Sequence, residues 1–549
     1  MASEYKLKDI TALPQNIGDK VEAEVEGLEG AKVLLVNTEG TVQALGAKCT
    51  HYGAPLIKGV VTKDGRITCP WHGACFSAKT GDIEDAPALD PLPTFKVSER
   101  NGSVYVTGEP AVLKAGRRKP RFKCSPSTDN TKPHDGGVVV VGGGSATIGL
   151  VEELRHKGYA GSITVISHEG YLPIDRPKLS KALIGDPAKI ALRPQKWYDE
   201  GSVKFVYDEV TDVQVSDKQV RTAGGRTFSY GKLVLATGGT ANLLPLDGLD
   251  GSLKNVFTIR SAENAEAISA AIGSKGKKIV IIGSSFIGLE VANATAADNT
   301  VCVIGREKVP LGKILGPAVG AGIQKDLEAK GVKFYLSAST KRAVASSESP
   351  SAIGFVELED GTSLPADLVI LGVGVKPATK FLEGNSTFSL ESDGSLATNG
   401  FYQVKGLDNV YALGDIAKAP YRGPGGTGAP TRIEHWNVAQ NSGRIAAGHI
   451  AGVAGPEPEV FIPVFWSALS AQLRYCGNTS AGFDDIVIQG SPLEGAFVAY
   501  YTKGDTVVAV ATVGRDPVMV QSAELMRLGK MPSKKELEGG LDLLTVGAP

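Results

Sequence analysis

The sequence predicts a multidomain fold: a small all-β domain, two α/β three-layer domains and a C-terminal α+β domain. Three observations support this prediction. The first hundred residues alternate apolar and polar positions at the period of a strand. Buried Val/Ile runs followed by glycine turns start near residues 138 and 278, and strand-like segments return after about residue 461. At 549 residues the chain is too long for one hydrophobic core.

Composition excludes several classes of protein. Hydrophobic residues make up 42%, charged residues 21%, and the formal net charge is -1, so no excess charge attracts nucleic acid or an anionic membrane. No apolar run reaches the roughly eighteen residues of a spanning helix, and the N-terminus lacks the pattern of a secretory signal. The six scattered cysteines suit a reducing compartment. We therefore expect a cytoplasmic protein without a membrane span, with a mitochondrial location as the alternative.

Residues 1–108 contain the segments that predict the all-β domain, such as AKVLLVN, GTVQALG and SVYVTG, separated by Gly, Asn and Asp turns. Residues 109–136 follow. They are rich in Pro, Lys, Arg and Ser and show neither the helical nor the strand period, so they predict a linker.

Two Cys/His pairs lie in the predicted β domain, C-x-H at Cys49 and His51 and C-x-x-H at Cys69 and His72. Two thiolates and two imidazoles suit either tetrahedral zinc or a Rieske 2Fe-2S centre, in which two histidines replace two cysteines on one iron. Zinc fingers usually keep the cysteines together and the histidines together. Here each loop supplies one of each, which favours the iron–sulfur cluster.

The segment around these pairs resembles Rieske domains, and in particular the ferredoxin type. The respiratory type adds a third cysteine to each loop to form a disulfide, but those positions hold Ala54 and Trp71 here. The resemblance therefore implies a reduction potential toward the low end of the Rieske range. Cys75 has no partner cysteine in the first loop, and we expect it to pack in the core.

A glycine-rich turn follows the first Val run, in VVVVGGGSAT. Gly142 and Gly144 occupy the tight-turn and pyrophosphate-approach positions of G-x-G-x-x-G. Thr147 replaces the third glycine, which predicts looser packing of the helix on the strand. Glu169 follows the next strand and can accept a hydrogen bond from a ribose hydroxyl. The turn predicts a dinucleotide site.

Four further motifs occur in order along the chain: LPIDRPKLSKAL, LVLATGG, NVYALGDIA and EHWNVAQNSGRIAA. With them the chain resembles the two-dinucleotide-domain flavoprotein reductases, in particular the apoptosis-inducing-factor-like group that carries an N-terminal Rieske domain. The resemblance covers nearly the whole chain. It implies an FAD-binding domain at 137–260 and 390–455, an NAD(P)-binding domain at 261–389 and a C-terminal domain at 456–549 that is similar to a reductase dimerisation domain.

The resemblance also implies the residues that bind FAD. Asp415 in the GD motif would bind the ribitol, and Trp436 would stack at the pyrimidine end of the flavin. For Trp436 the alternative is a core side chain. The full set implied for FAD is Gly142, Gly144, Glu169, Arg176, Lys181, Val210, Thr237, Gly238, Asp415, Glu434, His435 and Trp436.

Lys181 and Glu290 are the catalytic residues that the resemblance implies. A lysine near the N5 edge of the flavin stabilises the anionic reduced ring, and its charge requires a carboxylate partner. Glu290, in the second glycine motif, is that partner in the family pattern. The alternative is an ordinary surface ion pair.

The second glycine motif, VIIGSSFIGLE, would hold the nicotinamide nucleotide by the same resemblance. Ser285 replaces its middle glycine, which predicts reduced affinity. After the next strand, Arg306 stands where NAD-binding proteins place an acid, and this favours the 2'-phosphate of NADPH slightly over NADH, with Glu307 nearby as a counterargument. A solvated Arg306 is the alternative. The residues implied for NAD(P)H are Gly283, Ser285, Gly288, Arg306, Gly372 and Gly374.

Together these features predict an oxidoreductase that passes hydride from NAD(P)H to FAD, then single electrons to the Rieske cluster and to an unknown acceptor, a protein or a small oxidant. The alternative is a redox-gated signalling flavoprotein with slow turnover. A disulfide reductase is excluded because no cysteine pair follows Gly142, and a siroheme nitrite reductase because four further clustered cysteines are missing. A homodimer is left open.

Overall fold

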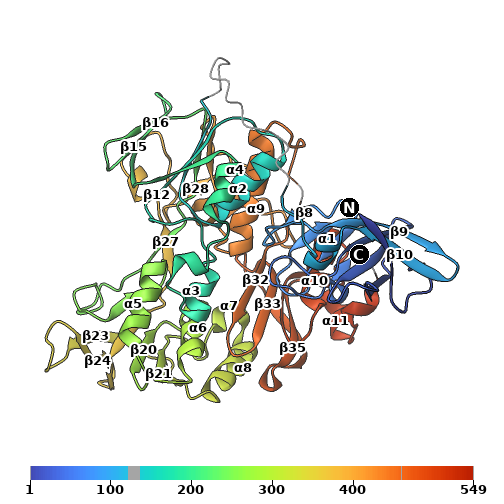
Figure 1. Cartoon of the computed structure of the whole chain (residues 1–549). Helices are drawn as coiled ribbons and strands as arrows, with labels where there is room; N and C mark the ends of the chain where they lie inside the picture. Colours follow the sequence, from blue (N-terminus) through green and yellow to red (C-terminus); the bar gives the residue numbers. More distant parts are fainter. Residues whose placement is uncertain (1, 121–135, 459, 548–549) are drawn as a thin grey trace.

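The computed structural model describes residues 2–120, 136–458 and 460–547. Figure 1 shows the two α/β domains on one side of the molecule, with the N-terminal β domain on the other side next to the C-terminal domain. Within these described ranges, no helix is long and apolar enough to cross a membrane.

The N-terminal domain contains two antiparallel sheets. The first has the order β1-β10-β9-β4-β3-β2 and the second the order β5-β6-β7-β8. Their strands are β1 (Ser3–Lys6), β2 (Lys20–Glu24), β3 (Lys32–Thr38), β4 (Thr41–Gly46), β5 (Val60–Val61), β6 (Arg66–Thr68), β7 (Cys75–Ser77), β8 (Ile83–Asp85), β9 (Thr94–Arg100) and β10 (Ser103–Gly108). The Cys49 loop enters the second sheet before β5, and the Cys69 loop joins β6 to β7, so both predicted ligand loops lie at this small sheet.

The predicted linker begins with a helix, α1 (Pro110–Ala115), which contacts β3. Pro110 fits the first turn because its missing N–H has no partner there, and Gly116 ends the helix in the left-handed conformation at φ 61°. The sequence prediction missed α1 because one short helix carries little periodicity. Residues 121–135 of the predicted linker lie outside the described residues.

A parallel sheet of order β13-β12-β11-β17-β29 forms the centre of the first α/β domain. Successive residues of a buried strand point to opposite faces. Val138 and Val140 therefore pack with α2 and α9, whereas Val139 and Val141 pack against the sheet β14-β15-β16.

The elements of this domain come from two separate stretches of the chain. The strands are β11 (Val138–Val141), β12 (Ile163–Ser167), β13 (Val203–Tyr207), β14 (Val210–Gln214), β15 (Gln219–Thr222), β16 (Thr227–Ser229), β17 (Lys232–Leu235), β28 (Leu396–Ala397), β29 (Val410–Ala412), β30 (Ala417–Pro420) and β31 (Pro430–Thr431). The helices are α2 (Ser145–His156), α3 (Pro177–Ala182), α4 (Gln195–Glu200) and α9 (Trp436–Ile450). The parallel pairing of β17 with β29 joins the two stretches in one sheet.

The second α/β domain repeats this plan, with a parallel sheet of order β19-β26-β20-β21-β22 and a small antiparallel sheet on one face. Its strands are β19 (Val256–Thr258), β20 (Lys278–Ile282), β21 (Thr300–Ile304), β22 (Lys333–Tyr335), β23 (Thr340–Ala345), β24 (Ile353–Leu358), β25 (Ser363–Pro365) and β26 (Leu368–Leu371). Its helices are α5 (Ala262–Ile272), α6 (Phe286–Thr295), α7 (Gly312–Leu315) and α8 (Pro317–Glu328). The pair β18 (Gly239–Ala241) and β27 (Val375–Pro377) connects the two α/β domains.

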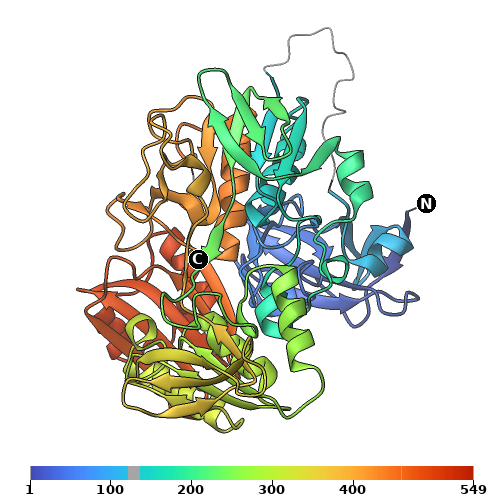
Figure 2. The same cartoon turned by 90° about the vertical axis from the view of Figure 1, so that its left-hand side faces the viewer.

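The C-terminal domain is an antiparallel sheet of order β32-β33-β36-β35-β34 with two helices. Its elements are β32 (Val464–Ala468), β33 (Gln472–Gly477), β34 (Asp485–Ser491), β35 (Ala496–Lys503), β36 (Thr506–Val513), α10 (Val518–Arg527) and α11 (Lys534–Glu538). Residues of this sheet share one hydrophobic cluster with the second α/β domain, and Val60 of the N-terminal domain joins another cluster with α10. Figure 2 shows the C-terminal domain, in red, above the second α/β domain. The C-terminal sheet therefore holds two other domains together.

Helices α2 and α9 pack unusually closely, because glycine lies where their backbones approach. A Cβ on Gly443 would lie 2.1 Å from the Ala146 carbonyl oxygen, and a Cβ on Gly149 would lie 2.2 Å from that of Gln440.

Thr147, the departure from the glycine motif, donates its hydroxyl to the Gly142 carbonyl at 2.7 Å. The predicted loosening at Thr147 is therefore wrong, since the hydroxyl ties the helix to the turn.

We expect Gly443→Ala to lower the free energy of unfolding by about 2 kcal/mol, because an added methyl group must separate two packed helices. Gly448→Ala in the same helix is the matched control. Its Cβ would meet only the Ala454 side chain, at 4.0 Å, and helix propensity favours alanine by about 1 kcal/mol. Chemical denaturation measures both variants. Equal midpoints for the two variants would contradict the close-packing argument.

Candidate functional site

The four predicted metal ligands come together between the two ligand loops. The buried thiols of Cys49 and Cys69 lie close enough to shift each other's pKa, and the Nδ1 atoms of His51 and His72 are 3.0 Å apart. In the part of the chain that the structure describes, no three such side chains converge on one point. Convergence in pairs fits a 2Fe-2S centre of the Rieske type, because each iron takes two protein ligands.

The two ligand loops have the same backbone geometry. In the first, the Gly53 N–H donates to the Cys49 carbonyl at 2.9 Å and the Cys49 N–H donates to the Ala54 carbonyl at 2.8 Å. The second loop repeats both bonds at the equivalent positions, at 3.2 and 2.8 Å. Gly53 and Gly73 have φ values of +79° and +71°, which glycine adopts without strain. The flanking glycines thus form the tight turns of both ligand loops.

Three of the four ligands favour the protonation state that binds a metal, whereas contact with the Cys69 thiol and burial raise the pKa of Cys49. Burial holds the pKa of His51 down at about 4. Burial, together with the nearby His51 imidazole, holds the pKa of His72 lower still. Burial opposes ionisation of Cys69, but the Cys49 thiol and the backbone N–H groups of Trp71 and His72 lower its pKa. Neutral imidazole and ionised thiol are the forms that bind a metal.

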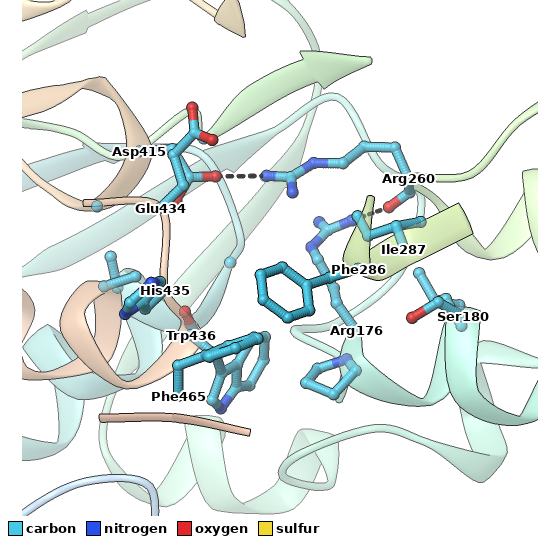
Figure 3. A pocket seen from close by; sticks show the side chains of 18 of the residues that line it. Arg176, Ser180, Arg260, Phe286, Ile287, Asp415, Glu434, His435, Trp436 and Phe465 are labelled. Carbon is cyan, nitrogen blue, oxygen red and sulfur yellow. Dashed lines mark hydrogen bonds and ion pairs between the residues drawn. The ribbon is translucent and has the colours of Figure 1, made fainter. Parts of the chain in front are cut away.

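A cavity of about 220 Å³ opens where the two α/β domains and the C-terminal domain meet. Figure 3 shows Phe286 at the middle of its wall, with Arg260 and Asp415 on one side and His435, Trp436 and Phe465 on the other. Residues of the predicted FAD set that line it are Gly144, Arg176, Lys181, Gly238, Asp415, Glu434, His435 and Trp436, and the predicted catalytic residue Glu290 also lines it.

Lys181 and Glu290 form the ion pair that the family pattern implied, with Nζ and Oε1 2.9 Å apart. Glu290 is 3% exposed. Its carboxylate also accepts hydrogen bonds from Ser180 of α3 and Ser467 of β32. The pair is therefore not an exposed surface pair, and it joins three domains at the cavity wall.

Arg176 and Asp415 are each held in place by a further charge. Arg176 pairs with Glu169 and donates to the Arg260 carbonyl at 2.9 Å. The guanidinium of Arg260 pairs with Asp415 at 2.9 Å. Glu169 lies behind the cavity wall and is not part of it. Its carboxylate is already engaged by Arg176 and by the Tyr171 hydroxyl at 3.0 Å. The two carboxylates and two guanidinium groups form one network along the cavity.

The residues present fit FAD. A Cβ on Gly144, at the N-terminus of the long helix α2, would face open space, so a phosphate can approach the helix end. Among the residues that the structure describes, none hydrogen-bonds the buried Nδ1 of His435, and burial lowers the pKa of this imidazole to about 4. Trp436 and Phe465 supply aromatic faces for a flat ring. The cavity thus offers a site for a phosphate, a buried nitrogen in need of a partner and surfaces for stacking.

Besides Glu169, three further predicted FAD residues lie outside the cavity lining. Gly142 has a φ of +109°, and a Cβ there would lie 2.3 Å from the Ala236 carbonyl oxygen, so this glycine shapes the turn. The Thr237 hydroxyl donates to the Ala378 carbonyl at 2.8 Å. Val210 is buried in the hydrophobic core with Val206.

The residues predicted to hold the nicotinamide nucleotide surround the second glycine turn. A Cβ on Gly283 would lie 2.3 Å from the Gly372 carbonyl oxygen, and one on Gly288 would lie 2.3 Å from that of Gly283. Ser285 donates its hydroxyl to the Gly372 carbonyl at 2.8 Å. Gly374 has a φ of +89°. The backbone here is packed as tightly as in the first turn, although serine replaces the middle glycine.

Arg306 is exposed directly after β21. The neighbouring Glu307 accepts a hydrogen bond from the Lys313 N–H at 2.8 Å. Its carboxylate is therefore engaged by the α7 segment, which weakens the counterargument that Glu307 offered to a phosphate-binding Arg306.

Sequence reasoning missed Trp466, which joins the two parts of the site. Its side chain lines the cavity. Its ring centroid lies 4.4 Å from that of His72 and 5.9 Å from that of His51. Trp466 is 6% exposed. The strand-like segment VFWSA carries no local signal for this role.

Comparisons with known proteins agree with this geometry. The family model described as pyridine nucleotide-disulphide oxidoreductase matches residues 136–443, the Rieske [2Fe-2S] domain model matches residues 7–96, and the reductase C-terminal model matches residues 464–541. Apoptosis-inducing factor 3 of Homo sapiens is 37% identical, over 94% of this chain and 83% of its own length.

Solved reductase structures share the fold. A ferredoxin reductase from Rhodopseudomonas palustris is 27% identical with a TM-score of 0.68, covering 75% of this chain and 99% of its own. The covalent putidaredoxin reductase–putidaredoxin complex gives 29% identity and a TM-score of 0.68, covering 74% and 97%.

The fold, the cavity and the paired ligands define an FAD-dependent NAD(P)H oxidoreductase that carries a Rieske iron–sulfur domain, similar to ferredoxin reductases. The chain belongs to the pyridine nucleotide-disulphide oxidoreductase family. The resemblance drawn from the sequence is confirmed. Disulfide chemistry does not follow from the family name, because the sequence has no cysteine between Gly142 and Cys302.

We expect Glu290→Ala to lower the free energy of unfolding by about 2 kcal/mol, because it leaves Lys181 and two buried hydroxyl groups without their acceptor. Ser467→Ala removes one hydrogen bond to the same carboxylate and is the matched control, with an expected loss of about 1 kcal/mol. Thermal unfolding of both variants measures the difference. A Glu290→Ala protein as stable as the wild type would show that the network contributes no stability.

Proposed function

We propose that this protein oxidises NAD(P)H at the cavity and passes the electrons singly across its own domain boundary, to the Rieske centre and then to a separate acceptor. When bound, FAD accepts the two electrons of a hydride, and a 2Fe-2S centre accepts one at a time. The chain thus contains both a two-electron entry and a one-electron outlet.

The position of Trp466 is the observation that carries this proposal. Trp466 lines the cavity, and its ring centroid lies 4.4 Å from that of His72 and 5.9 Å from that of His51, so one residue borders both proposed redox sites. Trp466 is almost fully buried, which excludes water from this path. The putidaredoxin reductase relative was solved as a complex with a second protein. We propose that the Rieske domain of this chain replaces such a partner.

We assign the catalytic role at the cavity to Lys181 and Glu290. Glu290 neutralises the ammonium group of Lys181 and fixes its position, since the carboxylate is itself held by two serine hydroxyls. The ammonium group then lies at the cavity wall, where it stabilises negative charge on a reduced flavin. The ligand and nucleotide residues predicted from the sequence, and its domain boundaries, are part of the same proposal.

The preference for NADPH is also a proposal. It is supported by the exposed guanidinium of Arg306 at the end of β21 and by the engagement of Glu307 with the Lys313 N–H. Without a free carboxylate at the strand end, a 2'-phosphate meets a cation and no anion.

The proposal predicts that Trp466→Leu slows electron transfer from flavin to cluster by at least about tenfold, because an aliphatic side chain leaves a gap between the two sites. Flavin reduction by NADPH should keep its rate. Anaerobic stopped-flow measurements follow flavin bleaching and cluster reduction as separate optical signals, with reduced-cluster electron paramagnetic resonance as confirmation.

Two cysteine variants serve as controls for this experiment. Cys69→Ser removes a proposed ligand and should lose the cluster and the iron, whereas Cys75→Ser changes a fully buried thiol outside the four-ligand set and should keep both. If reduced flavin leaves an intact cluster oxidised, the electron path is wrong. Slow turnover with a long-lived reduced flavin and a change of oligomeric state would support the signalling alternative instead.

Arg306→Ala tests the nucleotide preference. We expect the KM for NADPH to rise about tenfold, equivalent to one charge-assisted hydrogen bond of about 1.4 kcal/mol. The KM for NADH should stay constant and serves as the internal control in the same steady-state assays. An equal rise for both nucleotides, or no rise for either, would contradict the assignment.

A further inference from the structure

A guanidinium group of the C-terminal domain reaches the second ligand loop. Arg474 lies in β33, and its side chain is 9% exposed. Its Nε donates to the Trp71 carbonyl at 2.9 Å, and its Nη1 pairs with Asp516 Oδ1 at 3.1 Å. Trp71 stands between the ligands Cys69 and His72, so this contact reaches the interior of the loop.

The Trp71 carbonyl belongs to the same peptide group as the His72 N–H. That N–H and the N–H of Trp71 lie near enough to the Cys69 sulfur to lower the pKa of its thiol. A cation that hydrogen-bonds a peptide oxygen polarises the whole peptide group and strengthens its N–H as a donor. Hydrogen bonds to cluster sulfur stabilise the more negative, reduced form and raise the reduction potential.

The charge of Arg474 acts in the same direction as this polarisation. The guanidinium lies close enough to interact electrostatically with both Cys69 and His72. In a buried setting such an interaction is weakly screened, and it favours the form of the cluster that carries the extra electron. Asp516 offsets part of this effect because it neutralises the outer end of the guanidinium.

We propose that Arg474 is a positioning residue that raises the reduction potential of the Rieske centre by polarising the peptide between Trp71 and His72. The potential is thus determined partly by the C-terminal domain and not by the Rieske domain alone. The inference rests on the proposed function only in requiring a 2Fe-2S centre at the four-ligand site, and it does not require electron transfer from the flavin.

The test is a redox titration of the FAD-loaded, cluster-loaded full chain with dithionite and mediators, followed by electron paramagnetic resonance of the reduced cluster. Arg474→Gln keeps a neutral donor for the Trp71 carbonyl but removes the charge. We expect the equilibrium constant for electron uptake to fall about tenfold, which for one electron is a lowering of about 59 mV. An unchanged potential would overturn the proposal.

Two further variants separate this effect from loosened docking. Arg527→Gln removes another guanidinium that crosses the boundary, paired with Asp64 at 2.9 Å, and should leave the potential unchanged. Asp516→Asn removes the counter-charge of Arg474 and should raise the potential, a direction that structural damage does not explain. Equal lowering in Arg474→Gln and Arg527→Gln, or lowering in Asp516→Asn, would overturn the proposal.

The titration reports the cluster alone, so the two proposals can fail separately. If NADPH does not reduce the cluster but the Arg474→Gln shift is present, the proposed electron path is wrong and the role of Arg474 stands. If NADPH reduces the cluster but the reduction potential is unchanged in Arg474→Gln, only the present inference is overturned.

Discussion

Contact between the ligand loops of the Rieske domain and the edge strand β32 is the constraint on which the redox arrangement depends. Gly73 serves two requirements there. Its φ of +71° closes the loop that carries His72, and a Cβ at this position would lie 3.1 Å from a methyl carbon of Val464. The same residue thus forms the turn and lets the sheet approach. Since Trp466 follows Val464 on this strand with its side chain on the same face, the close approach also puts the indole against the imidazole rings.

Hydrogen bonds to the backbone fix the orientation of the docked Rieske domain. Arg193 donates to the Leu89 carbonyl at 2.7 Å, Arg444 to that of Ile83 at 2.6 Å, and Asn437 to that of Ala86 at 2.9 Å. Because backbone acceptors cannot change rotamer, these contacts define one orientation better than paired flexible side chains do. The docking also buries the histidine ligands, and burial keeps both imidazoles neutral. The docking that orients the domain therefore also keeps its two histidines in the neutral form that binds a metal.

Residues whose role depends only on neighbouring positions in the chain could be predicted from the sequence. Residues that act across domain boundaries could not. The ligand loops and glycine turns depend on backbone conformation and donor type within a few positions, so their motifs are readable. Trp466 and Arg474 lie in ordinary alternating strands, where an inward-facing residue looks the same whether it fills a core or reaches a redox centre. Thr147 could not be read correctly either, because the benefit of its hydroxyl depends on where the Gly142 carbonyl points.

Docking and reduction must influence each other if Arg474 acts as proposed. The guanidinium stabilises the extra electron only while β33 contacts the Trp71 carbonyl, so by linkage an electron on the cluster strengthens that contact by the same factor. The reduced domain is then held more firmly than the oxidised one. An acceptor that binds only the undocked domain would therefore meet a reduced centre that is less populated than the docked one. Tyr52 is 41% exposed and stacks on His51 with ring centroids 3.8 Å apart, so the docked domain keeps one exposed ring in contact with a histidine of the four-ligand site.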